Sequence, residues 1–153
     1  MNPVRMIVLG AGARGMDAYA PYALIAPDQL QIVGVAEPRE TRRNAFAARY
    51  GLPENAIFSD WRDALNAGID ADAVLVATQD NEHVEPACSA MERGYDVLLE
   101  KPIAKSEAEL KRIYDTSVRT GKRAAVCHVL RYTRFFNTLK AIIDSGEIGD
   151  VVN

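Results

Sequence analysis

Short apolar runs alternate along the chain with longer segments in which apolar residues recur every three or four positions. The short runs occupy residues 4–9, 31–36, 73–77, 96–99 and 124–127, and a shorter run at 56–58 predicts a further strand or an extended segment. Runs of four to six nearly uninterrupted apolar residues are typical of parallel strands that are covered on both faces. The pattern therefore predicts a mostly parallel β-sheet.

The longer segments carry the spacing and the end signals of helices. Residues 82–93 repeat apolar positions at i, i+3, i+4 and i+7, and Gly94 follows them. Ser106 and Glu109 form a capping box, and Gly121 closes that helix. Further helices are predicted at 39–50, 60–67 and 133–145. This alternation predicts an α/β fold, a doubly wound parallel sheet with its ligand site at the carboxyl ends of the strands.

The last residues interrupt this alternation. Residues 148–152 resemble the first residues of a strand, which has no partner in the preceding pattern. We therefore expect the chain to be part of a longer protein.

Composition narrows the class of function. The 153 residues are 48% hydrophobic and 25% charged, which is ordinary for one globular domain. The 18 basic residues are scattered and the net charge is −3, which argues against a nucleic-acid or membrane partner. The first residues have no basic stretch, and their apolar run is too short for a signal peptide or a membrane span. Two cysteines and two histidines without metal-ligand spacing predict no metal site and a reducing, cytoplasmic location.

A glycine-rich turn follows the first predicted strand. Gly10, Gly12 and Gly15 are spaced as in dinucleotide-binding turns, and Ala13 and Arg14 lie between them, where a helix N-terminus offers N–H groups to phosphates. Glu37 ends the second predicted strand, 22 residues after Gly15, where an acid accepts hydrogen bonds from the adenosine ribose. The strand, turn, helix and acid together predict a dinucleotide site.

The charges beside this site bear on the choice of cofactor. Glu37 disfavours a 2′-phosphate, so NAD is expected as the cofactor and NADP remains an alternative. Arg39, Arg42 and Arg43 follow the acid. They either neutralise a phosphate, or Arg39 stacks on adenine while the other two lie on a solvated helix face.

Two further segments end predicted strands. In the first, Thr78, Asn81 and His83 are candidate cofactor contacts. Alternatively, Asp80 or Asn81 is the N-cap of the following helix. His83 is either a cofactor contact or an ordinary surface residue. Cys88 lies on the apolar stripe of a predicted helix and Cys127 in a predicted strand, so both are predicted to be small buried side chains.

The second segment is Glu100-Lys101-Pro102. Opposite charges at the end of a buried strand are costly unless they are paired or face a cleft. Lys101 is the candidate catalytic residue, because its cation can stabilise an alkoxide during hydride transfer. Glu100 is a further candidate on the cofactor side. Pro102 permits a cis bond that directs the lysine, and Arg131 is a candidate beside Lys101 on the substrate side. His128 and Tyr132 are expected to pack.

These motifs resemble the glucose-fructose oxidoreductase/inositol dehydrogenase (Gfo/Idh/MocA) family of NAD(P)-dependent oxidoreductases. The resemblance rests on the glycine turn, Thr78 and His83, the segment 100–106, Arg131 and the segment 146–149. It implies a Rossmann domain at 1–128, followed at 129–153 by a crossover helix and the start of an absent C-terminal α/β substrate domain. Gln79 departs from the proline that is frequent in the family.

The resemblance also implies an activity. It implies hydride transfer between the nicotinamide and a sugar, polyol or related hydroxyl substrate, with Lys101 contacting both and the acid/base residue in the absent domain. It implies a homo-oligomer acting on a small molecule. A glycosidase with an internally recycled cofactor and a non-catalytic dinucleotide sensor are the alternatives.

Overall fold

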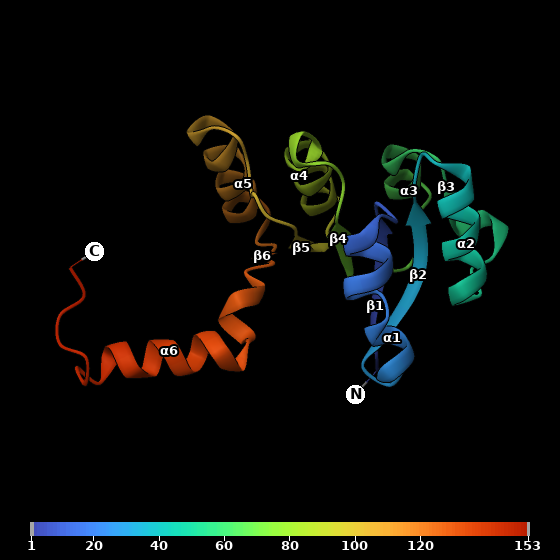
Figure 1. The fold of residues 1–153 in the computed structure, drawn as a ribbon. Helices are drawn as coiled ribbons and strands as arrows, with labels where there is room; N and C mark the ends of the chain where they lie inside the picture. The colour runs from blue at the N-terminus through green and yellow to red at the C-terminus, as the bar shows by residue number, and fades with distance from the viewer. Residues whose placement is uncertain (1, 153) are drawn as a thin grey trace.

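The computed structural model describes residues 2–152 and contains one six-stranded parallel sheet. The strands lie in the order β3-β2-β1-β4-β5-β6 (Figure 1). Their bounds are Val4–Leu9 for β1, Leu30–Ala36 for β2, Ile57–Phe58 for β3, Ala73–Val76 for β4, Asp96–Leu99 for β5 and Ala124–Val126 for β6. This order is that of a dinucleotide-binding Rossmann sheet, which reverses its winding between β1 and β4. The predicted doubly wound fold is confirmed.

Helices connect successive strands. The α-helices are α1 (Tyr22–Ile25), α2 (Glu40–Tyr50), α3 (Trp61–Asn66), α4 (Val84–Glu92), α5 (Glu107–Thr120) and α6 (Arg134–Asp144). Short 3₁₀ turns are η2 (Glu54–Ala56), η3 (Asp80–Glu82) and η4 (Val129–Tyr132), and the glycine turn continues into a π-helix, η1 (Ala13–Tyr19). The predicted capping box is shifted by one residue, because Glu109 accepts the amide of Lys105 rather than that of Ser106.

Two apolar cores cover the two faces of the sheet. On one face, side chains of β1, β4 and β5 such as Leu9 and Val76 pack against α3, α4 and α5. On the other, Val8, Val35 and Leu75 pack against Phe46 of α2 and the segment after the glycine turn. Successive residues of β1 thus enter opposite cores, which explains why the strand is apolar without a break.

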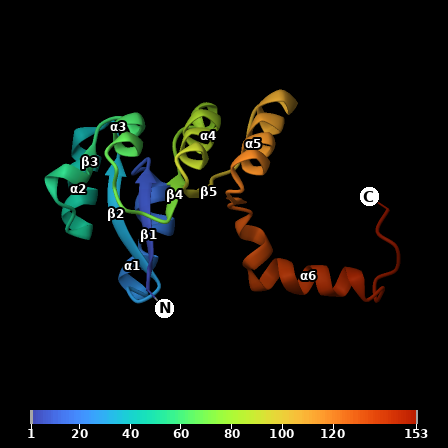
Figure 2. The ribbon, with the colours of Figure 1, turned by 180° about the vertical axis from the view of Figure 1, so that it is seen from behind.

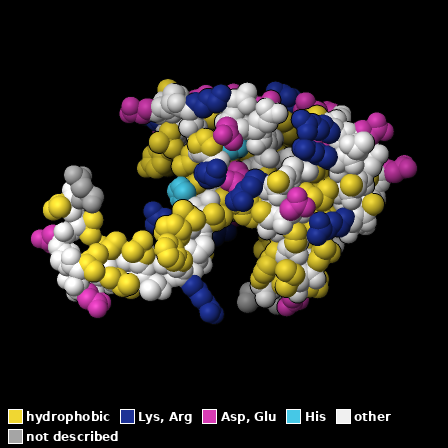
Figure 3. Space-filling model, viewed as in Figure 1, with side chains coloured by type: hydrophobic (Ala, Val, Ile, Leu, Met, Phe, Trp, Pro, Cys, Tyr) yellow, Lys and Arg dark blue, Asp and Glu magenta, His cyan; other side chains and the backbone are white. Residues whose placement is uncertain are grey.

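Helix α6 lies apart from both cores. It extends away from the sheet (Figure 1), as the view from behind confirms (Figure 2). None of its residues is buried, and an apolar row that includes Phe136 and Leu139 is partly exposed (Figure 3).

The prediction of a strand at 148–152 is wrong. These residues form the end of a turn and irregular structure, and Gly149 among them has φ +74°. A positive φ turns the chain, which an extended strand does not permit. Between residues 2 and 152 no helix is long and apolar enough to cross a membrane.

Candidate dinucleotide site

A cleft of about 460 Å³ opens at the carboxyl ends of β1, β2 and β4. It therefore lies at the position where the sheet reverses its winding, the place where α/β sheets bind their ligands. The lining residues are Gly10, Gly12, Ala13, Arg14, Ala36, Glu37, Pro38, Arg39, Arg42, Ser59, Asp60, Trp61, Arg62, Ala77, Thr78, Gln79 and Glu82.

The three glycines of the turn meet different surroundings. A Cβ at Gly10, where φ is +97°, would lie 2.4 Å from the carbonyl oxygen of Ala77, and one at Gly15 would lie 2.0 Å from the carbonyl oxygen of Gly10. Both positions exclude a side chain because backbone packs against them. A Cβ at Gly12 would meet only Arg42 Nη1, at 3.8 Å, so that its backbone is bare toward the cleft. Such a bare backbone is what a pyrophosphate needs for close approach.

Glu37 joins the end of β2 to the glycine turn. Its Oε2 accepts the amide of Ala11 at 2.9 Å, and its Oε1 accepts the amide of Arg39 at 3.0 Å. The residue is 6% exposed and lines the cleft. A carboxylate oxygen has two lone pairs, so each still offers one to a ribose hydroxyl.

The three arginines after Glu37 differ in what they contact. Arg43 donates to the carbonyl oxygens of Glu37 and Pro38, at 2.7 and 3.1 Å, and so holds the loop that carries the acid. Arg39 and Arg42 line the cleft. Arg43 is half-buried, whereas Arg42 is exposed and its Nη1 lies 3.8 Å from the position of a Cβ at Gly12.

The predicted site residues after β4 differ in their surroundings, because Thr78 lines the cleft and His83 is buried. Thr78 lines the cleft and donates its hydroxyl to the carbonyl oxygen of Glu82 at 3.0 Å. Asn81 is exposed in η3, and it lines neither this cleft nor the cavity described below; no side chain caps η3. His83 is 1% exposed, so the alternative that it is a surface residue is wrong. Its Nδ1 lies 2.6 Å from the carbonyl oxygen of Pro102, and its Nε2 3.3 Å from that of Thr78.

Glu100 is buried behind the glycine turn. It is 3% exposed, and its Oε1 accepts hydrogen bonds from Arg14 Nε and from the hydroxyl of Tyr19, the latter at 2.7 Å. Burial by itself raises the pKa of Glu100, but the hydrogen bonds from Tyr19, Arg14 and the Lys101 amide outweigh it and hold the pKa below its ordinary value. Glu100 is therefore ionised at neutral pH.

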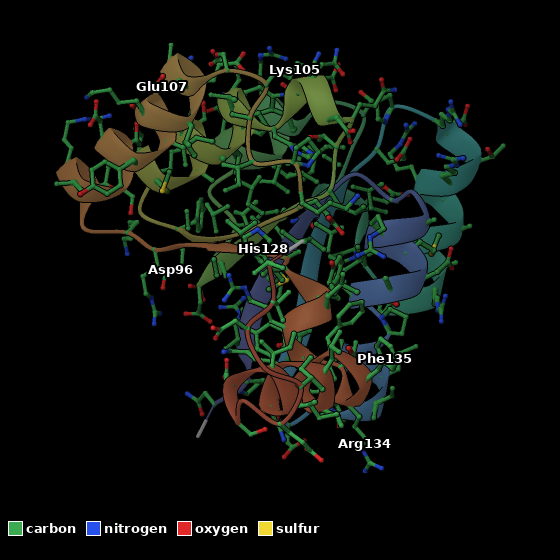
Figure 4. All side chains as sticks on the ribbon, turned by 60° about the vertical axis from the view of Figure 1, so that its left-hand side comes forward. Asp96, Lys105, Glu107, His128, Arg134 and Phe135 are labelled. Carbon is green, nitrogen blue, oxygen red and sulfur yellow. The ribbon has the colours of Figure 1, made fainter. Side chains whose placement is uncertain are left out.

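Lys101 and Arg131 line a second cavity, of about 380 Å³, with Cys127, His128, Val129 and Leu130. The Lys101–Pro102 bond is cis. His128 stands at the edge of the sheet, where the chain turns toward Arg134 and Phe135 of α6 (Figure 4). His128 is exposed and Tyr132 is 82% exposed, so the expectation that both pack is wrong. Both cysteines are free and buried, as predicted.

The sequence analysis did not predict that residues 59–62 line the cleft. Trp61 lines the cleft with the Arg62 guanidinium 4.2 Å from its ring centroid, and Arg62 also pairs with Asp60. These residues follow β3, whose two paired residues were expected only as a strand or an extended segment. The general rule that ligands bind beyond the carboxyl ends of strands would have pointed to them.

Comparison with known proteins agrees with this geometry. Residues 4–128 match the model of the Gfo/Idh/MocA oxidoreductase family, NAD-binding Rossmann fold. Inositol 2-dehydrogenase of Klebsiella pneumoniae (strain 342) is 31% identical over 147 residues, which are 95% of this chain and 43% of that protein. D-Glucoside 3-dehydrogenase of Escherichia coli K12 is 28% identical over 98% of this chain and 42% of its own length.

A solved structure has a similar fold. An NAD-binding protein from Listeria innocua superposes with a TM-score of 0.81 at 30% identity, over 98% of this chain and 41% of that one. The chain thus spans less than half the length of these relatives. Because the family model covers most of the chain and the glycine turn, Glu37 and the cleft lie within the matched residues, the chain belongs to the Gfo/Idh/MocA oxidoreductase family, as its NAD-binding Rossmann domain.

Proposed function

We propose that the chain is the nucleotide-binding part of an oxidoreductase that transfers a hydride between a nicotinamide cofactor and a hydroxyl carbon of a sugar, polyol or related compound. The observation that carries the proposal is the bare backbone of Gly12 beside the buried acid Glu37, in one cleft at the reversal point of the sheet. This pair suits a pyrophosphate and a ribose diol respectively.

The residues of the cleft fit the parts of a dinucleotide in order. Gly12, the N-cap of η1, and Ala13, its first residue, would hold the pyrophosphate with backbone N–H groups, while Glu37 would accept the adenosine ribose hydroxyls. Pro38, Arg39 and Trp61 would flank the adenine. Thr78 and Gln79 also line the cleft, and they follow β4, which pairs with β5, the strand that leads to Lys101.

The chemistry assigned to Lys101 is electrostatic. A nicotinamide accepts the hydride when an alcohol is oxidised, and the alcohol oxygen gains negative charge as its proton departs. The exposed ammonium group of Lys101, beside Arg131 in the second cavity, would stabilise that charge. The sugar or polyol class of substrate is proposed because the curated relatives include dehydrogenases of inositol and of D-glucosides.

Calorimetric titration of the chain with NADH tests the proposal. We expect saturable binding below millimolar concentration, and weaker binding of NADPH because Glu37 opposes a 2′-phosphate. The absence of heat up to millimolar NADH would contradict the proposal. Equal affinities for the two cofactors would contradict only the role of Glu37 in selecting NAD.

The role of Lys101 is tested by Lys101→Ala in an enzyme that carries this domain. We expect kcat to fall by about 10²- to 10⁴-fold, the range typical of a group acting on the transition state, and the affinity for NAD to fall far less than kcat does. An unchanged kcat would remove Lys101 from the chemistry. Lys105→Ala, at a solvent-exposed lysine four residues further on, is the matched control.

A further inference from the structure

Three side chains form a hydrogen-bonded cluster between the two cavities. Arg14 and Tyr19 both donate to Oε1 of Glu100, and Arg14 Nη2 also donates to the Tyr19 hydroxyl at 2.8 Å. We call these three residues the Glu100 cluster. Arg14 lines the dinucleotide cleft, whereas the residue after Glu100 is Lys101, which lines the second cavity. The cluster therefore joins the glycine turn to the segment that carries the lysine.

The π-helical turn brings Arg14 and Tyr19 together. The amide of Ala20 donates to the carbonyl oxygen of Gly15 at 3.1 Å, a hydrogen bond between residues five apart. Such a bond places residues five apart one above the other, whereas an α-helix of 3.6 residues per turn would direct them to different faces. The Arg14 guanidinium consequently lies 5.1 Å from the centroid of the Tyr19 ring, and both groups reach the same carboxylate.

Two buried carboxylates thus hold the glycine turn from opposite sides. Glu37, at the end of β2, accepts the amide of Ala11, and Glu100, after β5, accepts Arg14. The remaining oxygen of each is bound to its own loop, since Glu37 accepts the Arg39 amide and Glu100 accepts the Lys101 amide at 2.8 Å. Glu37 supports the adenosine side of the cleft, and Glu100 supports the segment of Lys101.

The two supports share no hydrogen bond. The bond from the Ala11 amide to Glu37 and the bond from the Gly10 amide to the Ala36 carbonyl involve no atom of the Glu100 cluster. The Lys101 amide, in contrast, donates to the Glu100 carboxylate itself. Breaking the cluster should therefore displace Lys101 and leave the adenosine and pyrophosphate contacts in place.

We propose that the Glu100 cluster positions Lys101 against the nicotinamide half of the dinucleotide, and that Tyr19 is a positioning residue in it. The inference rests on the proposed function, because it assumes that NADH occupies the cleft with its nicotinamide toward Lys101. Tyr19 and Glu100 touch neither cavity, so they act through Arg14 and Lys101.

Comparing NADH with ADP-ribose, which lacks the nicotinamide, tests the inference by calorimetry. Tyr19→Phe removes the hydroxyl that donates to Glu100 and accepts from Arg14. In this variant we expect NADH affinity to fall about fivefold or more while ADP-ribose affinity stays within about twofold. Glu100→Gln should show the same selectivity with a larger loss. Glu37→Gln should instead weaken both ligands, because it supports the part they share.

A double variant shows whether Tyr19 acts through the lysine. Lys101→Ala should lower the ratio of NADH to ADP-ribose affinity, and adding Tyr19→Phe to it should lower the ratio no further. Tyr22→Phe is the matched control, since it removes a hydroxyl bonded to Gln29 Oε1 at 2.6 Å, outside both cavities.

The results distinguish failure of the proposed function from failure of the positioning role of the Glu100 cluster. A wild-type chain that does not bind NADH would overturn the proposed function and this inference with it. NADH binding with an affinity ratio that Tyr19→Phe leaves unchanged, or a parallel loss of both ligands, would overturn the inference alone. A wild-type affinity ratio near one would also overturn it, because the nicotinamide half would then make no favourable contact.

Discussion

Replacing Gly15 by alanine is expected to destabilise the fold by at least about 3 kcal/mol, at the upper end of the cost of overpacking a core. The added Cβ would lie 2.0 Å from the carbonyl oxygen of Gly10 and 3.2 Å from Val8 Cγ1. The first neighbour is backbone, so no rotamer change relieves the contact. The glycine turn or the end of β1 must move instead. Urea unfolding followed by the fluorescence of Trp61 measures the loss.

Gly51→Ala is the control for this prediction. Gly51 has φ +62° but nothing within 4 Å of an added Cβ, so its substitution should cost only the left-handed strain of about 1–2 kcal/mol. Gly15 has no positive φ, and its cost arises from packing alone. If Gly15→Ala is no more damaging than Gly51→Ala, the close packing of η1 on β1 is not as described.

Gly12→Ala is expected to abolish cofactor binding without harming the fold. Gly12 has φ −78° and ψ −170°, which alanine adopts freely, and an added Cβ would make only an ordinary contact with Arg42 Nη1. Stability should therefore change by less than about 1 kcal/mol. The methyl group would nevertheless stand in the cleft where the pyrophosphate must approach the backbone, so NADH should no longer bind at concentrations that saturate the wild type.

The two glycine variants separate packing from binding. Calorimetry with NADH and urea unfolding should give a folded but non-binding protein for Gly12→Ala and an unstable one for Gly15→Ala. Gly12→Ala with wild-type affinity would show that the phosphates bind elsewhere. A large loss of stability in Gly12→Ala would show that its side of the turn is packed rather than open.

The strands were predictable because their side chains enter two cores. Residues 4–9 and 96–99 form strands with the predicted bounds, and each of the other four strands differs from its prediction by one residue at one end. An uninterrupted apolar run is the direct result of burial on both faces. The glycine turn was predictable for a similar reason, since the backbone leaves no room for a side chain at two of its positions.

The π-helix was not predictable from spacing. Seven residues are too few to separate one helical period from another, and Pro21, directly after the π-helix and its C-cap Ala20, has no amide to continue the turn. The sequence pattern therefore predicts a helix after Gly15 but not that Arg14 and Tyr19 meet. No strand forms at 148–152, because Gly149, between the apolar residues Ile148 and Val151, has φ +74° and turns the chain.

The hydrogen-bond partners of the buried polar groups also could not be predicted from the sequence. His83 contacts Pro102, and Glu100 contacts Arg14, 86 residues away. No local pattern records such pairs, because they arise where parallel strands bring distant loops to one edge of the sheet. The residue types alone indicated that Glu100 and Lys101 needed a partner or a cleft. The structure shows that Glu100 has the partner and that Lys101 faces a cavity.

Energy transfer from Trp61 to NADH tests the central claim most directly. Trp61 is the only tryptophan of the chain, and it lines the cleft in which the dinucleotide is placed. The account predicts saturable NADH emission on excitation of the tryptophan, which ADP-ribose displaces and which Gly12→Ala abolishes. NADH that binds without accepting energy from Trp61, or that Gly12→Ala binds as well as the wild type does, would contradict it.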